Sequence, residues 1–154
     1  MSRAEKAKEY FKSGYTCSQA VVLAFSDLCG VSEEFLLKQA LPFGGGIGRL
    51  RLTCGAVSGL VMAYGAIFGT SELDAEKKKT AYQEIRGLVE AFQAETGSVI
   101  CADLLAGKNL AVEKGGVAEE RSAEYYKKRP CADLVYLAAD LLEKFLAKKG
   151  VFSA

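Results

Sequence analysis

The sequence predicts an all-α protein, a compact bundle-like domain of about six to eight helices that spans residues 1–154. Apolar residues recur at helical spacing along most of the chain, and no segment alternates convincingly with the period of two that marks a β-strand. Helix-capping boxes also recur along the chain. Because the length is typical of one domain and no linker or low-complexity tract divides it, we expect a single helical domain.

Three helices are predicted before the first proline. Ser2 with Glu5 forms a capping box for a helix at about 3–13. The pattern T-x-x-Q that begins at Thr16 is a second capping box and starts the next helix. A third helix runs from Ser32 to Pro42, where proline ends it.

A Gly/Ala-rich helix is predicted to lie at the centre of the fold. It starts at Thr53, within an uncharged run over residues 52–71, and small residues recur on one of its faces. These small residues are Gly55, Gly59, Ala63 and Ala66. Such a face lets another helix approach closely, either within this chain or from a second copy in a homodimer. The four glycines of the run favour a buried helix over a membrane span, so no membrane partner is expected.

The C-terminal half is predicted to hold four more helices. Ser71 begins a long helix that ends at about Thr96, and Ser98 caps a short helix. A polar helix follows at 119–129, and Pro130 lies in the first turn of the last helix. The predicted inward side chains of the long helix are Ala81, Tyr82, Ile85, Leu88, Val89 and Phe92, and those of the last helix are Leu134, Leu137, Ala138, Leu141 and Phe145.

The composition excludes several classes of function. The 20 basic and 19 acidic residues are interspersed, which argues against a nucleic-acid or anionic-membrane partner. The chain has no histidine, so Ser-His-Asp and Cys-His catalysis within one chain are excluded. The first residues are charged and lack the apolar core of a signal peptide, so we expect a cytoplasmic protein. In that reducing compartment, five cysteines favour catalysis, metal binding or burial over structural disulfides.

Four of the five cysteines are predicted to lie in the first turn of a helix: Cys17, Cys54, Cys101 and Cys131. Unpaired backbone N–H groups and the positive end of the helix dipole favour a thiolate there. A thiolate is both a nucleophile and a metal ligand, so this placement serves either chemistry. Cys29 lies instead at the C-terminal end of its helix, where we expect it to fill the core.

A glycine-dense loop over residues 44–48 precedes Cys54 and leads into two arginines. It lacks the Lys-Ser/Thr pair of a P-loop and does not complete G-x-G-x-x-G, so these motifs do not favour nucleotide binding. Glycine here permits a tight crossing between helices. The functional alternative is that Arg49 or Arg51 stabilises the Cys54 thiolate, or that the loop N–H groups bind an anion.

With these residues, the chain resembles the family of redox-active proteins named for the cysteine pattern C_GCAxxG_C_C. Cys17 corresponds to the first cysteine, residues 54–59 to the GCAxxG box, and Cys101 and Cys131 to the last two. The order in the box is Cys-Gly-Ala here, and the glycine loop before it also fits the family. The resemblance implies a small helical protein with a four-cysteine redox or metal site, and it names no substrate.

Three functions remain open at this point. The first is thiol-disulfide or electron-transfer chemistry with an unknown redox partner, in which one cysteine attacks and another resolves the mixed disulfide. If the protein is an enzyme, this chemistry favours a thiol-dependent oxidoreductase. It requires no cofactor. The second is a zinc or iron–sulfur site made by the same four cysteines, against which their wide spacing argues. The third is a non-catalytic helical assembly module, in which the cysteines only fill space.

Overall fold

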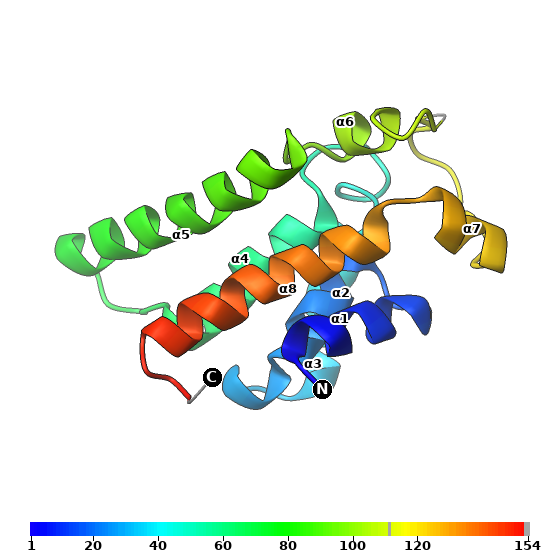
Figure 1. Cartoon of the computed structure of the whole chain (residues 1–154). Helices are drawn as coiled ribbons and strands as arrows, with labels where there is room; N and C mark the ends of the chain where they lie inside the picture. The colour runs from blue at the N-terminus through cyan, green and yellow to red at the C-terminus, as the bar shows by residue number, and fades with distance from the viewer. Residues whose placement is uncertain (111, 153–154) are drawn as a thin grey trace.

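The computed structural model describes residues 1–110 and 112–152, and over these residues it contains eight α-helices and no β-strand (Figure 1). The all-α prediction and the expected number of helices are therefore confirmed. The helices are α1 (Arg3–Lys12), α2 (Cys17–Ala24), α3 (Glu33–Ala40), α4 (Gly55–Phe68), α5 (Ala75–Thr96), α6 (Cys101–Ala106), α7 (Ala123–Lys128) and α8 (Cys131–Lys148), with short 3-10 turns η1 (Ser26–Leu28) and η2 (Leu41–Phe43).

Four helices, α1, α2, α4 and α8, enclose the core. Helix α8 crosses the middle of the molecule and packs against the other three (Figure 1). The largest side chains that are fully buried come from all four of these helices and from α5: they include Phe11, Val21, Leu60, Phe92, Val135 and Leu142. The Gly/Ala-rich helix α4 is thus central, as predicted, and it shares that position with α2 and α8.

The small-residue face of α4 packs against α2 of the same chain. A Cβ atom added at Gly59 would lie 2.8 Å from the carbonyl oxygen of Ser18, and one added at Gly55 would lie 3.0 Å from the Cβ of Cys17. The close helix approach predicted for this face is therefore observed at these two glycines. Because α2 occupies this part of the face, it is not available for a homodimer, and Ala66, at its far end, is exposed.

The buried stripe of α8 lies one residue further along than predicted. Its fully covered side chains are Ala132, Val135, Ala138, Ala139, Leu142 and Leu146. Of the predicted stripe only Ala138 belongs to this set, and Leu134, Leu137, Leu141 and Phe145 are partly buried at its border. The reason is that α8 contacts α1, α2, α4 and α5, so its buried face is wider than one stripe and has a different centre.

Helix α5 is the least covered of the long helices. Its N-cap is Asp74, whose carboxylate accepts hydrogen bonds from two first-turn N–H groups, so the predicted start at Ser71 is three residues early. Leu88 and Phe92 are buried as predicted, but Tyr82 is 58% exposed. Tyr82 lies in the N-terminal half, where it faces outward beside Lys78, whose ammonium is 5.6 Å from the ring centre.

Helix α7 is shorter than predicted, and the loop and helices around it lie at one end of the molecule. The polar helix predicted at 119–129 is shorter, because Ser122 caps α7 and the residues before it are not helical. Among the described residues, no helix combines the length and the apolar character needed to cross a membrane. The glycine loop, α6, α7 and the start of α8 gather at one end of the molecule (Figure 1).

Candidate functional site

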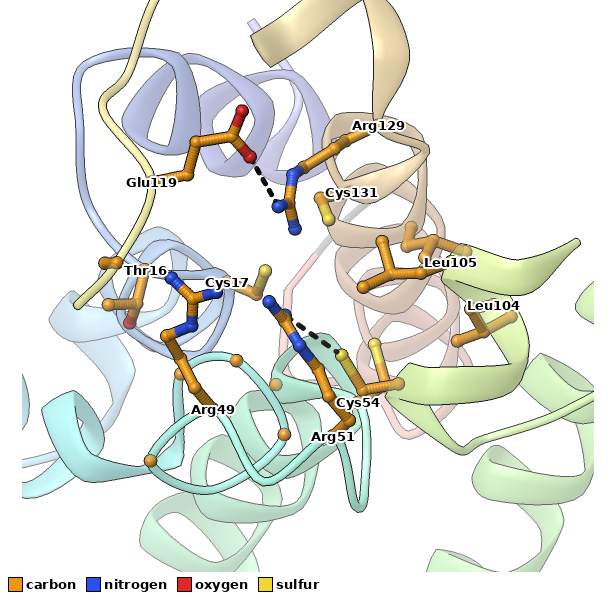
Figure 2. A pocket seen from close by; sticks show the side chains of 18 of the residues that line it. Thr16, Cys17, Arg49, Arg51, Cys54, Leu104, Leu105, Glu119, Arg129 and Cys131 are labelled. Atoms are coloured by element: carbon orange, nitrogen blue, oxygen red, sulfur yellow. Dashed lines mark hydrogen bonds and ion pairs between the residues drawn. The ribbon is translucent and has the colours of Figure 1, made fainter. Parts of the chain in front are cut away.

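One cavity at this end of the molecule is lined by four of the five cysteines: Cys17, Cys54, Cys101 and Cys131 (Figure 2). Its volume is about 250 Å³. The four residues come from α2, from the residue before α4, and from the starts of α6 and α8. Folding therefore brings together cysteines that are far apart in the sequence. Cys29 is not part of the cavity lining; it is buried in the core, 3.2 Å from the carbonyl oxygen of Phe25.

Three of these cysteines occupy the first position of a helix. Cys17 begins α2, where Thr16 and Gln19 form the predicted capping box, and Cys101 and Cys131 begin α6 and α8. Cys54 was predicted to lie inside the first turn of its helix, and in the structure it is the N-cap residue that precedes α4. Four helix starts therefore meet at the cavity.

The capping of the short helix α6 differs from the prediction. Its N-cap is Ile100 and not Ser98. The Ser98 hydroxyl accepts a hydrogen bond from the Ile100 N–H at 3.0 Å and donates one to the Asp103 carboxylate at 2.8 Å. Ser98 thus holds the turn that leads into Cys101, although it is not the cap itself.

A two-stranded contact holds Cys54 next to Cys101. Thr53 and Ile100 form an isolated antiparallel bridge. The Cys54 N–H donates to the Val99 carbonyl at 2.7 Å, and the Cys101 N–H donates to the Leu52 carbonyl at 2.6 Å. In this register the two cysteine side chains lie on the same face of the pair. A single bridge has no periodic sequence signal, and the sequence did not predict it.

The glycine loop turns through a run of left-handed backbone conformations. Gly45, Gly46 and Gly48 have positive φ angles, and so do Arg49 and Arg51, at 64° and 61°. Left-handed geometry at a residue other than glycine costs roughly 1–2 kcal/mol, and such strain concentrates at functional sites. A Cβ atom at Gly46 would lie 2.8 Å from the Cβ of Cys101, so glycine is needed where the loop passes this cysteine.

Four arginines line the cavity, and sequence reasoning identified only two of them. Arg49 and Arg51 come from the glycine loop, whereas Arg121 and Arg129 flank α7 and were missed. Arg129 lies two residues before Cys131, which is a signal that could have been used, but nothing in the sequence around Arg121 indicates its place. The Arg129 guanidinium forms an ion pair of 2.6 Å with Glu119 (Figure 2).

The other three arginines bind backbone carbonyls. Arg51 is buried; its Nε donates to the Glu113 carbonyl at 2.9 Å. Arg49 donates to the carbonyl of Val117, and its Nε is buried with no hydrogen-bond partner among the described residues. Arg121 donates to the carbonyl of Phe11 near the end of α1 and to that of Tyr15 between α1 and α2, and it lies 4.4 Å from the centre of the Phe11 ring.

Arg51 stabilises a different cysteine from the one expected. Its Nη1 lies 3.7 Å from the sulfur of Cys101, whereas the prediction from the sequence paired Arg49 or Arg51 with Cys54. The reason is the bridge described above, which turns Cys101 toward the loop. Burial raises the pKa of the Cys101 thiol, and the Arg51 guanidinium acts in the opposite direction.

Cys131 is the cysteine whose ionisation the site favours. A hydrogen-bonding interaction with Cys17 lowers the pKa of Cys131 to about 7, against the effect of burial and with help from the nearby guanidinium groups, Arg129 first. The same interaction, together with burial, raises the pKa of Cys17. Cys131 is therefore the more readily ionised thiol of the pair, and Cys17 is its hydrogen-bonding partner.

The helix-start prediction of a stabilised thiolate fails for the remaining cysteines. Burial raises the pKa of Cys54 to about 12, although the N–H groups of Ala56 and Val57 act in the opposite direction. Desolvation of the thiolate thus outweighs the helix N-terminus at Cys54, and at Cys101 it outweighs the Arg51 guanidinium as well.

The arrangement of side chains does not support the metal alternative. Over residues 1–110 and 112–152, no group of three or more histidine, cysteine, aspartate or glutamate side chains is placed so that it could hold a metal ion. All five cysteines are free thiols in this structure.

The site thus defines an all-α protein with four cysteines and four arginines around one cavity. The chain belongs to the family described as putative redox-active protein (C_GCAxxG_C_C), whose model matches residues 15–145. The resemblance stated from the sequence is thereby confirmed. No curated protein and no solved structure matches the chain.

Proposed function

We propose that the protein is a thiol–disulfide redox protein in which Cys131 is the attacking thiolate and Cys17 the resolving thiol. The observation that supports this assignment is the interaction of these two side chains at the starts of α2 and α8, inside an arginine-lined cavity. A pKa near 7 for Cys131 also suits the reaction, because the best attacking thiol has a pKa near the ambient pH. Membership of a redox-active family supports the same class of chemistry.

The reaction proceeds in two exchange steps. The Cys131 thiolate attacks one sulfur of a disulfide R–S–S–R, so that a Cys131–S–R bond forms, the original S–S bond breaks, and R–S⁻ leaves and takes up a proton from water. Cys17 then loses its proton and attacks the Cys131 sulfur. The second R–S⁻ leaves with that proton. The protein dithiol is oxidised to a Cys17–Cys131 disulfide, and the substrate is reduced to two thiols.

The test is to identify the first disulfide that forms. Reduced protein is treated with bis(2-hydroxyethyl) disulfide, quenched with acid at intervals, and mapped by mass spectrometry without reduction. We expect a mixed disulfide on Cys131 followed by a Cys17–Cys131 bond. The Cys17→Ser variant should accumulate the mixed disulfide, because the pKa values of the other two cavity thiols, Cys54 and Cys101, are raised and these thiols attack slowly; Cys131→Ser should not react at Cys17.

The matched control is Cys29→Ser, since Cys29 is buried in the core and is not part of the cavity lining. This variant should follow the wild-type sequence of products. Circular dichroism of each variant shows whether the helices are retained. A first mixed disulfide on Cys54 or Cys101, or a first bond that joins Cys17 to either of them, would contradict the assignment.

A further inference from the structure

We propose that the disulfide reduced in this cavity is a small molecule that carries carboxylate or similar anionic groups, held by Arg49 and Arg121 beside the Cys17 and Cys131 sulfurs. This inference rests on the proposed function and adds the chemical class of the substrate. It depends on the balance of charge in the cavity, on the partners of each arginine and on the size of the space.

The charges that line the cavity do not balance. Its described lining contains four guanidinium groups and a single carboxylate, that of Glu119. That carboxylate is paired with Arg129 at 2.6 Å. Within residues 1–110 and 112–152, none of the other three arginines forms an ion pair; their hydrogen bonds to protein go to neutral carbonyls, to the Tyr126 hydroxyl or to the Cys101 sulfur. Even with Cys131 ionised, positive charge remains in excess.

Arg49 shows this excess most clearly. It comes from the strained part of the glycine loop and lines the cavity, and its Nε is buried without a hydrogen-bond partner in the described part of the chain. A buried donor of this kind is unfavourable unless something binds it. An anionic oxygen would supply both the missing acceptor and the missing charge, and an arginine presents its N–H groups in a geometry that suits a carboxylate.

The size and lining of the cavity restrict the rest of the ligand. About 250 Å³ lies just below the roughly 300–1,000 Å³ of typical small-molecule sites, so the space suits a short molecule. Leu41, Leu104 and Leu105 also line the space. The ligand that matches this lining has a short apolar chain between its disulfide and its charged ends.

The test compares three disulfides of similar length and different charge. They are 3,3′-dithiodipropionate, which is anionic, bis(2-hydroxyethyl) disulfide, which is neutral, and cystamine, which is cationic. We expect the rate constant for formation of the Cys17–Cys131 bond to be about tenfold higher for the anion than for the neutral compound, and lowest for the cation. Added salt should reduce this preference.

Variants and an unreactive analogue make the test specific to the arginines. Arg49→Gln and Arg121→Gln should each bring the anionic-to-neutral ratio toward one, whereas Arg86→Gln, on the exposed surface of α5, should keep it. With wild-type protein, 3,3′-thiodipropionate has the same carboxylates but no S–S bond, and it should slow the reaction with the neutral disulfide. This measurement does not depend on the folding of any variant.

The outcomes separate the two proposals. If the neutral disulfide oxidises Cys17 and Cys131 but the anion has no advantage and the thioether does not inhibit, the substrate class is wrong and the proposed function stands. If none of the three disulfides oxidises this pair, the proposed function fails and the substrate assignment fails with it.

Discussion

The cavity has two halves, each with two cysteines, and they differ in what surrounds the sulfur atoms. Cys17 and Cys131 start two helices of the core and interact with each other, and the pKa of Cys131 is lowered to about 7. Cys54 and Cys101 are held side by side by a backbone bridge, and burial raises the pKa of both thiols. The comparison shows that a helix start alone does not make a thiolate in this protein.

The decisive difference is the number of partners that can stabilise a negative charge. Cys131 has a neighbouring thiol and is near three guanidinium groups. Cys101 has no stabilising thiol and is near two guanidinium groups, Arg51 at 3.7 Å and Arg129, and Cys54 has only backbone N–H groups. Because desolvation opposes ionisation at every one of these sites, the number of compensating groups decides which sulfur reacts.

The largest expected effect is a difference in alkylation rate between the two halves. At pH 7 about half of Cys131 is thiolate, against roughly one part in 10⁵ of Cys54, while the lower nucleophilicity of an acidic thiol offsets two to three decades. We therefore expect iodoacetamide to label Cys131 on the order of 100-fold faster than Cys54. Peptide mapping after brief labelling measures both rates, and equal rates would remove the distinction between the halves.

The second effect is that Cys131 and Cys54 change the free energy of unfolding in opposite directions as pH rises. The pKa of Cys131 in the folded protein, about 7, is below the unfolded value of roughly 8.5, so this cysteine adds up to about 2 kcal/mol as pH rises from 7 to 8.5. The pKa of Cys54, about 12, is above the unfolded value, so its contribution is lost as pH rises from 8.5 toward 12.

Urea unfolding at several pH values tests these slopes. Cys131→Ala should lose the gain between pH 7 and 8.5, and Cys54→Ala should lessen the fall above pH 8.5. A constant loss of stability from either truncation does not affect the comparison, because only the change with pH matters. Parallel curves for wild-type protein and both variants would contradict the two pKa shifts.

The smallest of the three effects comes from removing the partner of Cys131. In Cys17→Ala the thiolate loses its hydrogen-bonding interaction, and a hydrogen bond to a charged group contributes roughly 1.5–3 kcal/mol. The pKa of Cys131 should rise, so that its labelling rate below pH 7 falls about tenfold. Thiolate absorbance at about 240 nm against pH provides the measurement, and an unchanged midpoint would show that the arginines alone lower the pKa.

Much of the fold was predictable because local signals agreed with one another. The capping boxes at Ser2 and Thr16 and the glycines of α4 specify helix starts and a close helix contact, and the structure contains them. The register of the buried face on α8 was not predictable to one residue. That register depends on four packing partners, and no periodicity within α8 contains this information.

The cysteines of the cavity were likewise predictable, but not their chemistry. Their positions at helix starts indicated a shared site. The partner of Arg51 and the presence of Arg121 depend on how distant segments meet, and the pKa of Cys54 depends on how deeply the fold buries it. These properties are determined by tertiary contacts, so a single sequence did not provide them.

The close approach of α4 to α2 at Gly55 helps to determine the dimensions of the cavity. A Cβ atom added at Gly55, the residue after Cys54, would lie 3.0 Å from the Cβ of Cys17, so the absence of a side chain lets α4 approach α2 this closely beside the two thiols. A methyl group at Gly55 would act as a wedge between α2 and α4. The absence of a side chain at Gly55 thus keeps α2 and α4, and with them Cys17 and Cys54, close together at the cavity.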